Sequence, residues 1–192
     1  NHDFLENNSS RLDALSPIID SLQNEQINYY KNRGVYKDEN IDWVVYSLMD
    51  HNITPDIDPN SSNVKIGLFH GPVNEAMTDV GYTVSNRSIT TSLFNGHDIT
   101  LLGDIHKYQV LTTNCSKKSS IVYCGSIIQQ NHGEDLNGHG CVVWNLKQRT
   151  FKQLNLPNDY GFFTIDINKG KLITDISNLP KKVRLRVRCF ES

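Results

Sequence analysis

The sequence predicts an α/β fold, and two apolar segments that end in glycine turns support this prediction. Val64 to Phe69 is a mostly apolar run that leads into His70-Gly71, and Ile99 to Leu102 is a second run that leads into Gly103. Continuous apolar runs of this kind are typical of parallel strands that are buried on both faces. In α/β proteins, sites form beyond the carboxyl ends of such strands.

Composition limits the possible functions. The chain has 192 residues, of which 38% are hydrophobic, enough for one domain and part of a second. The formal net charge of -2 excludes a global basic field, so contact with a polyanion would need a local patch. The four cysteines show no Cys-x-x-Cys spacing and are expected to be reduced thiols of an intracellular protein. No apolar stretch is long enough to span a membrane.

The first part of the chain predicts a loop, a helix and three strands. Residues 1–10 are polar and rich in Asn, as in a loop. The chain does not begin with Met and ends directly after a strand-like run, so we expect it to be truncated at both ends. Ser16-Pro17 predicts the start of a short helix, with Ser as the cap and Pro at the first helical position. Apolar runs then predict strands at 27–30, 35–36 and 41–48.

The middle of the chain alternates between apolar runs and polar loops. Residues 54–63 contain two prolines and two aspartates and are expected to form a loop. The pattern after this loop predicts a short helix at 88–94 and strands at 64–69, 98–102, 121–124, 141–146 and 151–156.

A second unit is expected after a hinge at Pro157-Asn158-Asp159. Residues 162–167 and 172–176 predict a hairpin, because the polar turn Asn168-Lys169-Gly170-Lys171 separates them, and 183–189 predicts a last strand. We therefore expect a main domain over residues 1–156 and the beginning of a smaller one over 157–192.

Several potential metal ligands lie where predicted strands give way to loops. Their mixed oxygen and nitrogen donors suit manganese or iron better than a thiolate-seeking ion, and they are Asn1, His70, Asp104 and His106. Two such ions could hold the attacking and leaving oxygens of a phosphoryl displacement. His2 could act as a general acid if Asp3 orients it. Any one histidine taken alone is better explained as a satisfied loop or core residue, but the joint pattern favours a site.

Two further groups of residues could contact a substrate. In the last predicted strand, apolar residues alternate with four cations, which places the cations on one face: Lys182, Arg184, Arg186 and Arg188. This strip could contact phosphates, or it could be a solvated edge that charge protects against mispairing. His132 lies in a polar loop and could line a substrate groove or serve only the loop.

The ligand-bearing segments resemble the motifs of calcineurin-like metallophosphoesterases. Asn1-His2-Asp3 resembles their Gly-Asn-His-Asp/Glu motif, Phe69-His70-Gly71 their single-His strand end, and Gly103 to His106 their Gly-His-x-His motif. Three longer segments resemble the SbcD/Mre-type exonucleases of DNA double-strand-break repair, and most closely those of large DNA viruses and phages. These segments are 101–109, 123–134 and 139–144.

The resemblance implies two mixed β-sheets flanked by helices, followed by a small capping domain that helps to hold DNA. It implies two divalent metal ions, with manganese expected, where Asn1, His70 and Asp104 bind one ion and His106 the other. It implies His2 as the catalytic acid, a coiled-coil ATPase of the SbcC/Rad type as partner, and a homodimer.

The sequence departs from this family in two places. The Asp-x-His and Gly-Asp motifs that precede Asn1 in the family are absent, so the chain alone is expected to lack a complete dinuclear site and to be inactive. Asp104 stands where the family has His; it can still coordinate, as a harder ligand. Two alternatives remain: a phosphoesterase for monoesters or cyclic nucleotides, and a non-catalytic scaffold that binds DNA or the ATPase.

Overall fold

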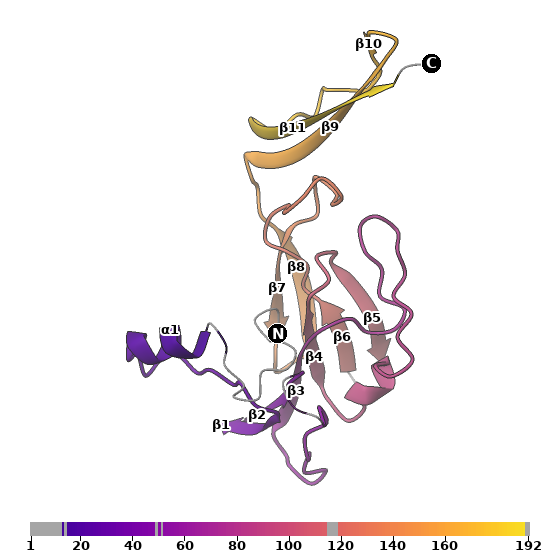
Figure 1. Ribbon diagram of the computed structural model, residues 1–192. Coiled ribbons are helices and arrows are strands. Elements are labelled where there is room, and N and C mark those ends of the chain that lie inside the picture. Colours follow the sequence, from indigo (N-terminus) through magenta and orange to yellow (C-terminus); the bar gives the residue numbers. More distant parts are fainter. Residues whose placement is uncertain (1–12, 14, 49, 51, 115–118, 191–192) are drawn as a thin grey trace.

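The computed structural model describes residues 13, 15–48, 50, 52–114 and 119–190, and it is dominated by β-strands. Strands account for 39% and helices for 7% of these residues. A six-stranded sheet, a two-stranded sheet and a three-stranded sheet follow one another along the molecule (Figure 1). The elements are α1 (Leu15–Leu22), β1 (Gly34–Asp38), β2 (Ile41–Tyr46), β3 (Val64–His70), the 3-10 helix η1 (Thr91–Phe94), β4 (Ile99–Gly103), β5 (Gln109–Asn114), β6 (Ser119–Tyr123), β7 (Gly140–Asn145), β8 (Thr150–Asn155), β9 (Tyr160–Asn168), β10 (Lys171–Leu172) and β11 (Lys182–Phe190).

The expected α/β sandwich with flanking helices is wrong. In the described ranges α1 is the one α-helix, and none of its residues is buried. The connection from β3 to β4 contains Pro72, Gly81 and a single 3-10 turn, and its backbone hydrogen bonds join distant points such as Asn74 and Ile89. Proline and glycine disfavour helix interiors, which explains why this connection is a folded loop and not a crossover helix.

The six-stranded sheet aligns the carboxyl ends of its central strands. Its order is β1-β2-β3-β4-β6-β5, with parallel pairing from β2 through β3 and β4 to β6 and antiparallel strands at both edges. His70, the last residue of β3, is paired with Gly103, the last residue of β4. The residues that follow these two strands are therefore brought to the same edge of the sheet.

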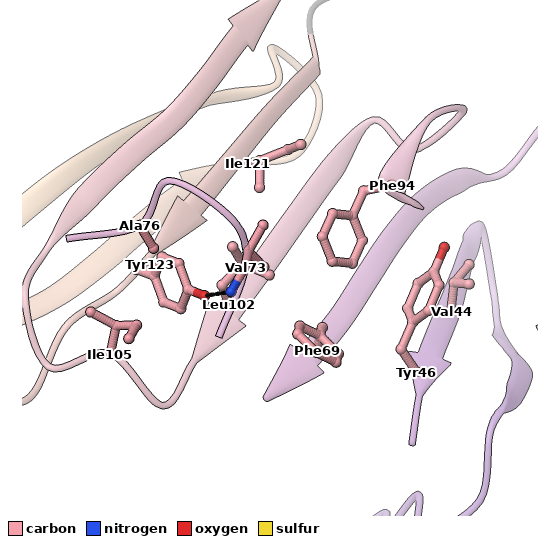
Figure 2. Packing of buried hydrophobic residues seen from close by; sticks show 10 residues of the cluster. All are labelled: Val44, Tyr46, Phe69, Val73, Ala76, Phe94, Leu102, Ile105, Ile121 and Tyr123. Atoms are coloured by element: carbon pink, nitrogen blue, oxygen red, sulfur yellow. Dashed lines mark hydrogen bonds between the residues drawn. The ribbon is translucent and has the colours of Figure 1, made fainter. Parts of the chain in front are cut away.

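One face of this sheet carries the hydrophobic core. Phe69, Leu102 and Tyr123 come from neighbouring strands, and the β3–β4 connection covers them with Val73 and Phe94, among others (Figure 2). Full burial of each such side chain stabilises the fold by about 1.5–3 kcal/mol. The β3–β4 connection therefore covers this face of the sheet, as the expected helices would have done.

The hydroxyl of Tyr123 fixes the turn that follows His70. It donates a hydrogen bond to the carbonyl oxygen of Gly71 at 2.8 Å and accepts one from the backbone N–H of Val73 at 2.9 Å. The side chain is buried, and burial raises the pKa of Tyr123 to about 12. An unionised hydroxyl can both donate and accept, so this contact holds the turn over the whole physiological pH range.

The helix α1 begins earlier than Ser16-Pro17 and lies away from the core. The Asp13 carboxylate accepts a hydrogen bond from the backbone N–H of Ser16 at 2.6 Å, as a capping residue does. The apolar side chains of Ile18 and Leu22 on this helix are exposed. The expected strand at 27–30 and helix at 88–94 are also wrong, because the former is irregular and only 91–94 forms the single turn η1.

The strands predicted from apolar runs are mostly confirmed, and the last part of the chain forms its own sheet. Strands β9 and β10 make the predicted turn at 168–171, although β10 has only two residues. Strand β11 lies parallel to β9, and all its residues are exposed. The division into domains at residue 156 stays a prediction. No helix in the described ranges combines the length and the apolar character needed to cross a membrane.

Candidate functional site

His70 and Asp104 meet where β3 and β4 end. The His70 Nε2 and the Asp104 Oδ1 are 3.8 Å apart, and half of the His70 side chain is exposed. Asp104 has a φ of 92°, in the left-handed region that residues other than glycine rarely adopt. Strained backbone of this kind is concentrated at functional sites, where the surroundings hold it in place. The predicted pair of ligands is thus brought together.

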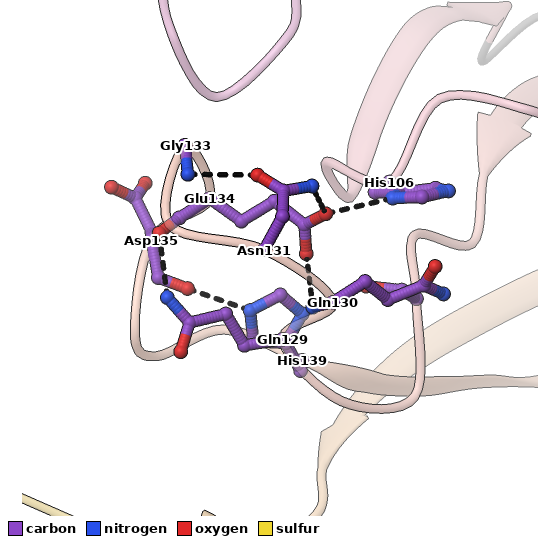
Figure 3. A network of polar contacts seen from close by, with 9 residues as sticks. His106, Gln129, Gln130, Asn131, Gly133, Glu134, Asp135 and His139 are labelled. Carbon is purple, nitrogen blue, oxygen red and sulfur yellow. Dashed lines mark hydrogen bonds and ion pairs between the residues drawn. The ribbon is translucent and has the colours of Figure 1, made fainter. Parts of the chain in front are cut away.

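His106 is oriented by a buried carboxylate. Its Nδ1 lies 2.8 Å from the Oε1 of Glu134, whose side chain is only 5% exposed (Figure 3). A carboxylate accepts hydrogen bonds, so Nδ1 carries the proton and, in the neutral ring, the Nε2 lone pair is the remaining acceptor. This arrangement of carboxylate and imidazole is the one that orients histidine ligands of metal ions.

The Glu134 carboxylate is itself fixed by its own loop. Its Oε2 accepts a hydrogen bond from the backbone N–H of Gln130 at 2.8 Å, and its Oε1 accepts one from the Asn131 side-chain amide at 2.6 Å. The side-chain amide of Gln129 donates to the Glu134 carbonyl oxygen at 2.9 Å. The orientation of His106 therefore depends on the fold of the loop between β6 and β7 (Figure 3).

An acidic pocket of about 210 Å³ lies beside His106. Asp79, Asp104 and Glu134 contribute carboxylates to its lining. Burial and the nearby carboxylates of Asp135 and Glu134 raise the pKa of Asp79. Such a surrounding favours positive charge, because a cation would offset the repulsion among the carboxylates.

The side chains of His70, Asp104 and His106 have the chemistry to bind a borderline divalent ion, but they are not grouped closely enough to form a complete metal site. Imidazole nitrogens and a carboxylate are the ligands that suit manganese or iron. Within the described part of the chain, however, no three side chains of His, Cys, Asp or Glu are grouped closely enough to hold a metal ion. His70 and Asp104 form a pair, and His106 is held separately by Glu134. The predicted residues Asn1, His2 and Asp3 lie outside the described residues.

Sequence reasoning did not find Glu134 or Gln129 as parts of this site. Glu134 is 28 residues from His106, so no local spacing links the two. The sequence predicts a polar loop here, with His132 as its candidate substrate contact. The one available signal was the density of Gln, Asn, His and Glu directly after the buried strand β6, which is unusual for a simple connection.

The four predicted cations share one face of β9–β11. Because β11 pairs with β9 in parallel register, they lie opposite the alternate residues of β9, and this cationic face comprises Tyr160, Phe162, Thr164, Asp166, Lys182, Arg184, Arg186 and Arg188. The Lys182 ammonium lies 4.7 Å from the centre of the Tyr160 ring, and the Arg184 guanidinium lies 5.5 Å from that of Phe162. Arg188 makes two hydrogen bonds to the Asp166 carboxylate, at 2.6 and 2.8 Å.

His132 lies against the cationic face, as part of the predicted DNA-contacting set. Its ring packs edge-on against Phe162, with centroids 5.1 Å apart, and its Nδ1 is 3.4 Å from the Thr164 hydroxyl. Burial and the positive charge of Arg186 lower the pKa of His132. The structure therefore joins the β6–β7 loop to the cationic face.

Two other histidines are bonded within the fold. The Nε2 of His139 donates to the Asp135 carbonyl oxygen at 2.7 Å, so its Nδ1 accepts from the Ser126 hydroxyl at 2.9 Å. His97 is buried, with its Nδ1 2.9 Å from the carbonyl oxygen of Phe94. Both rings are satisfied inside the protein, which matches the structural explanation for a histidine taken alone.

Comparison with known proteins shows similarity to a viral protein of undescribed activity. Over 198 residues the chain is 38% identical to "Uncharacterized protein R555" of Acanthamoeba polyphaga mimivirus. This match includes 97% of the chain but only 14% of that protein's length. No protein-family model matches the chain. The expected membership among the calcineurin-like metallophosphoesterases and SbcD/Mre-type nucleases does not hold, because the described residues form a strand-rich fold whose α-helix is exposed, and this does not fit an α/β fold flanked by helices.

Proposed function

We propose that this chain is part of a metal-dependent hydrolase that cleaves phosphodiester bonds in DNA, as an exonuclease or endonuclease in break repair or recombination. The observation that carries the proposal is the edge of the six-stranded sheet. There His70 and Asp104 lie 3.8 Å apart, and His106 follows with its Nδ1 bonded to buried Glu134. These residues support metal-dependent hydrolysis, and the cationic face supports DNA as the substrate.

The proposed roles follow from the donor atoms. The imidazole nitrogens of His70 and His106 and the Asp104 carboxylate would hold divalent manganese, with Asn1 as a further ligand. A bound divalent ion would stabilise the negative charge that develops on the phosphoryl oxygens. Glu134 keeps His106 in one tautomer and one orientation, as hydrogen-bonded partners of metal ligands do. His2, oriented by Asp3, would donate a proton to the leaving oxygen.

The cationic face supports a nucleic acid as the substrate. Lys182, Arg184 and Arg186 project from one side of an exposed strand, although the chain as a whole has a formal net charge of -2. A local strip of cations on an otherwise acidic chain is the pattern expected where a phosphate backbone is contacted. His132 packs on this strip and comes from the loop that also holds Glu134 and, through it, His106.

The test is cleavage by the full-length protein in the presence of manganese. A linear DNA duplex labelled at one end would be incubated with the wild-type protein and with His70→Ala and His106→Ala. We expect manganese-dependent shortening of the labelled strand, reduced at least a hundredfold in both variants, while the control Gln148→Ala, at an exposed position between β7 and β8, cuts normally. Cutting that continues without manganese, or that survives both substitutions, would contradict the proposal.

A scaffold that binds DNA without cutting it is the second candidate. The absence of a three-ligand cluster among the described residues favours it. DNA binding without cutting, in a full-length protein that binds manganese, would support it. The SbcC/Rad-type ATPase, the homodimer and the intracellular compartment stay predictions, which co-purification, sedimentation and localisation would test.

A further inference from the structure

A pocket of about 370 Å³ lies between the β6–β7 loop and the cationic face. Ile128 and Gln130 line it from the loop, and Tyr160, Phe162, Lys182 and Arg184 line it from β9 and β11. Its volume falls in the lower part of the range of small-ligand pockets, about 300–1,000 Å³. Gly161 also lines it, and a Cβ there would lie 2.6 Å from Pro180 and 2.8 Å from Leu136, so glycine is needed where these two residues approach β9.

One part of the pocket is aromatic and accessible. The Tyr160 side chain is 60% exposed, and Ile128 on the loop is also exposed. Phe162 lies two residues along the same face of β9 and also lines the pocket. Flat aromatic rings that a ligand can reach are the surfaces on which nucleobases stack, whatever the base.

The other part of the pocket supplies positive charge. The Lys182 ammonium donates a hydrogen bond to the Tyr160 hydroxyl at 3.1 Å, which keeps it beside that ring. In the described ranges no carboxylate forms an ion pair with Lys182 or Arg184, whereas the neighbouring Arg188 is paired with Asp166. Both cations lie over the aromatic rings, at 4.7 and 5.5 Å from the centroids of Tyr160 and Phe162. A phosphate that contacts these cations would therefore lie beside the two aromatic rings.

The wall behind the pocket is held rigidly. The Gln129 side chain accepts a hydrogen bond from the backbone N–H of Phe162 at 2.7 Å and donates one to the Phe162 carbonyl oxygen at 3.1 Å. It also donates to the carbonyl oxygen of Glu134, the residue that orients His106. The pocket is thus connected by hydrogen bonds to the proposed metal ligand.

We propose that this pocket binds one unpaired nucleotide of a single-stranded nucleic acid, with the base stacked on Tyr160 and Phe162 and the phosphate on Lys182 and Arg184. The combination of an accessible aromatic ring with cations that no described carboxylate pairs carries the proposal, because the faces of the bases in a duplex are covered by their neighbours. It rests on the proposed function and deepens it: the DNA strand that enters would be single-stranded at this point.

The experiment measures binding without cleavage. Fluorescence anisotropy would follow a labelled single-stranded oligothymidylate in EDTA, with an abasic strand of the same length as the probe that keeps the phosphates and lacks the bases. Tyr160→Leu removes an exposed ring and Tyr160→Phe keeps it. Tyr82→Leu, an equally exposed ring on the β3–β4 connection, is the matched control.

We expect Tyr160→Leu and the abasic strand each to weaken binding by about fivefold to a hundredfold, as the loss of one stacked base does. Tyr160→Phe and Tyr82→Leu should bind within twofold of the wild type. Equal binding of the abasic strand, unchanged binding by Tyr160→Leu, or no binding of the intact strand would each overturn the inference. Binding in EDTA is measured independently of cleavage. If binding depended on Tyr160 but the full-length protein did not cut DNA with manganese, the proposed function would be contradicted and the nucleotide pocket would not.

Discussion

The six-stranded sheet and the β9–β11 sheet present their side chains in opposite ways. In the first, the side chains of β3, β4 and β6 are largely buried, and what projects at the strand ends is the pair His70 and Asp104. In the second, every residue of β11 is exposed. A covered sheet can hold ligand atoms in fixed positions, whereas an open one offers a long contact surface. The six-stranded sheet is therefore suited to positioning ligand atoms, and the β9–β11 sheet is suited to contacting a partner.

The largest expected effect is the difference in lost protein stability when an isoleucine of each region is replaced by alanine. Ile66 in β3 is 1% exposed, and Ile173 after β10 is 59% exposed. Ile66→Ala should lower the free energy of unfolding by about 2–5 kcal/mol through lost burial and a cavity. Ile173→Ala should change it by no more than about 0.5 kcal/mol. Urea unfolding followed by the fluorescence of Trp43, which lies in β2, measures both; similar losses would show that the β9–β11 sheet is packed as tightly as the first.

The next effect concerns the link between the two regions at Glu134. Glu134→Gln replaces the anionic acceptor of the His106 N–H by a neutral one, and changes of this kind weaken metal affinity by about 10- to 100-fold. Titration calorimetry with manganese on the full-length protein measures it. Asp135→Asn, the adjacent exposed carboxylate of the same loop, is the control and should bind manganese nearly as the wild type does. Equal losses in the two variants would indicate a general electrostatic effect and would remove the orienting role of Glu134.

Most of the strands could be predicted from the sequence, but the strand expected at 27–30 is absent and the helices were not predicted correctly. Apolar runs such as Val64 to Phe69 predict their own strands, because burial on both faces needs only local composition. The cover of the sheet depends on where Val73 and Phe94 pack, which is a long-range property of a loop without periodicity. The resemblance of motifs therefore led to the wrong fold class, since motifs describe strand ends and not what lies on the sheet.

The candidate site was predictable to the same extent. Parallel strands that end together bring His70 and Asp104 to one edge, so their proximity follows from a simple rule. The partnership of His106 with Glu134 depends on the tertiary fold of the β6–β7 loop, and no spacing indicates it. Alternation placed the four cations on one face, but the parallel register that sets Asp166 beside Arg188 could not be read from β11 alone.

A third effect is the pH dependence of protein stability that arises from His97, which is buried just before β4. Burial lowers the pKa of His97 below its ordinary value of 6.5. Below about pH 6.5 the unfolded chain therefore takes up a proton that the folded protein does not, so the free energy of unfolding falls as the pH falls, until the lowered folded pKa is reached. For one group the slope is at most about 1.4 kcal/mol per pH unit. His97→Gln should flatten this slope between pH 7 and 5.5 in urea unfolding, and an unchanged slope would assign it to other groups.

The smallest effect tests whether the cations of the open sheet act alike. In single-stranded nucleic acid each phosphate contact contributes about 0.7 to the slope of log affinity against log salt concentration. Arg186→Gln should reduce this slope by about that amount, because no carboxylate among the described residues forms an ion pair with Arg186. Arg188→Gln should reduce it less, because the Arg188 guanidinium already gives two N–H groups to Asp166, which also lowers the pKa of that carboxyl. If Arg188→Gln instead gives the larger change, the Asp166 pair must open when the strand binds. The phosphate contacts would then extend over the whole cationic face and not only over the first half of β11, where the proposed nucleotide pocket lies.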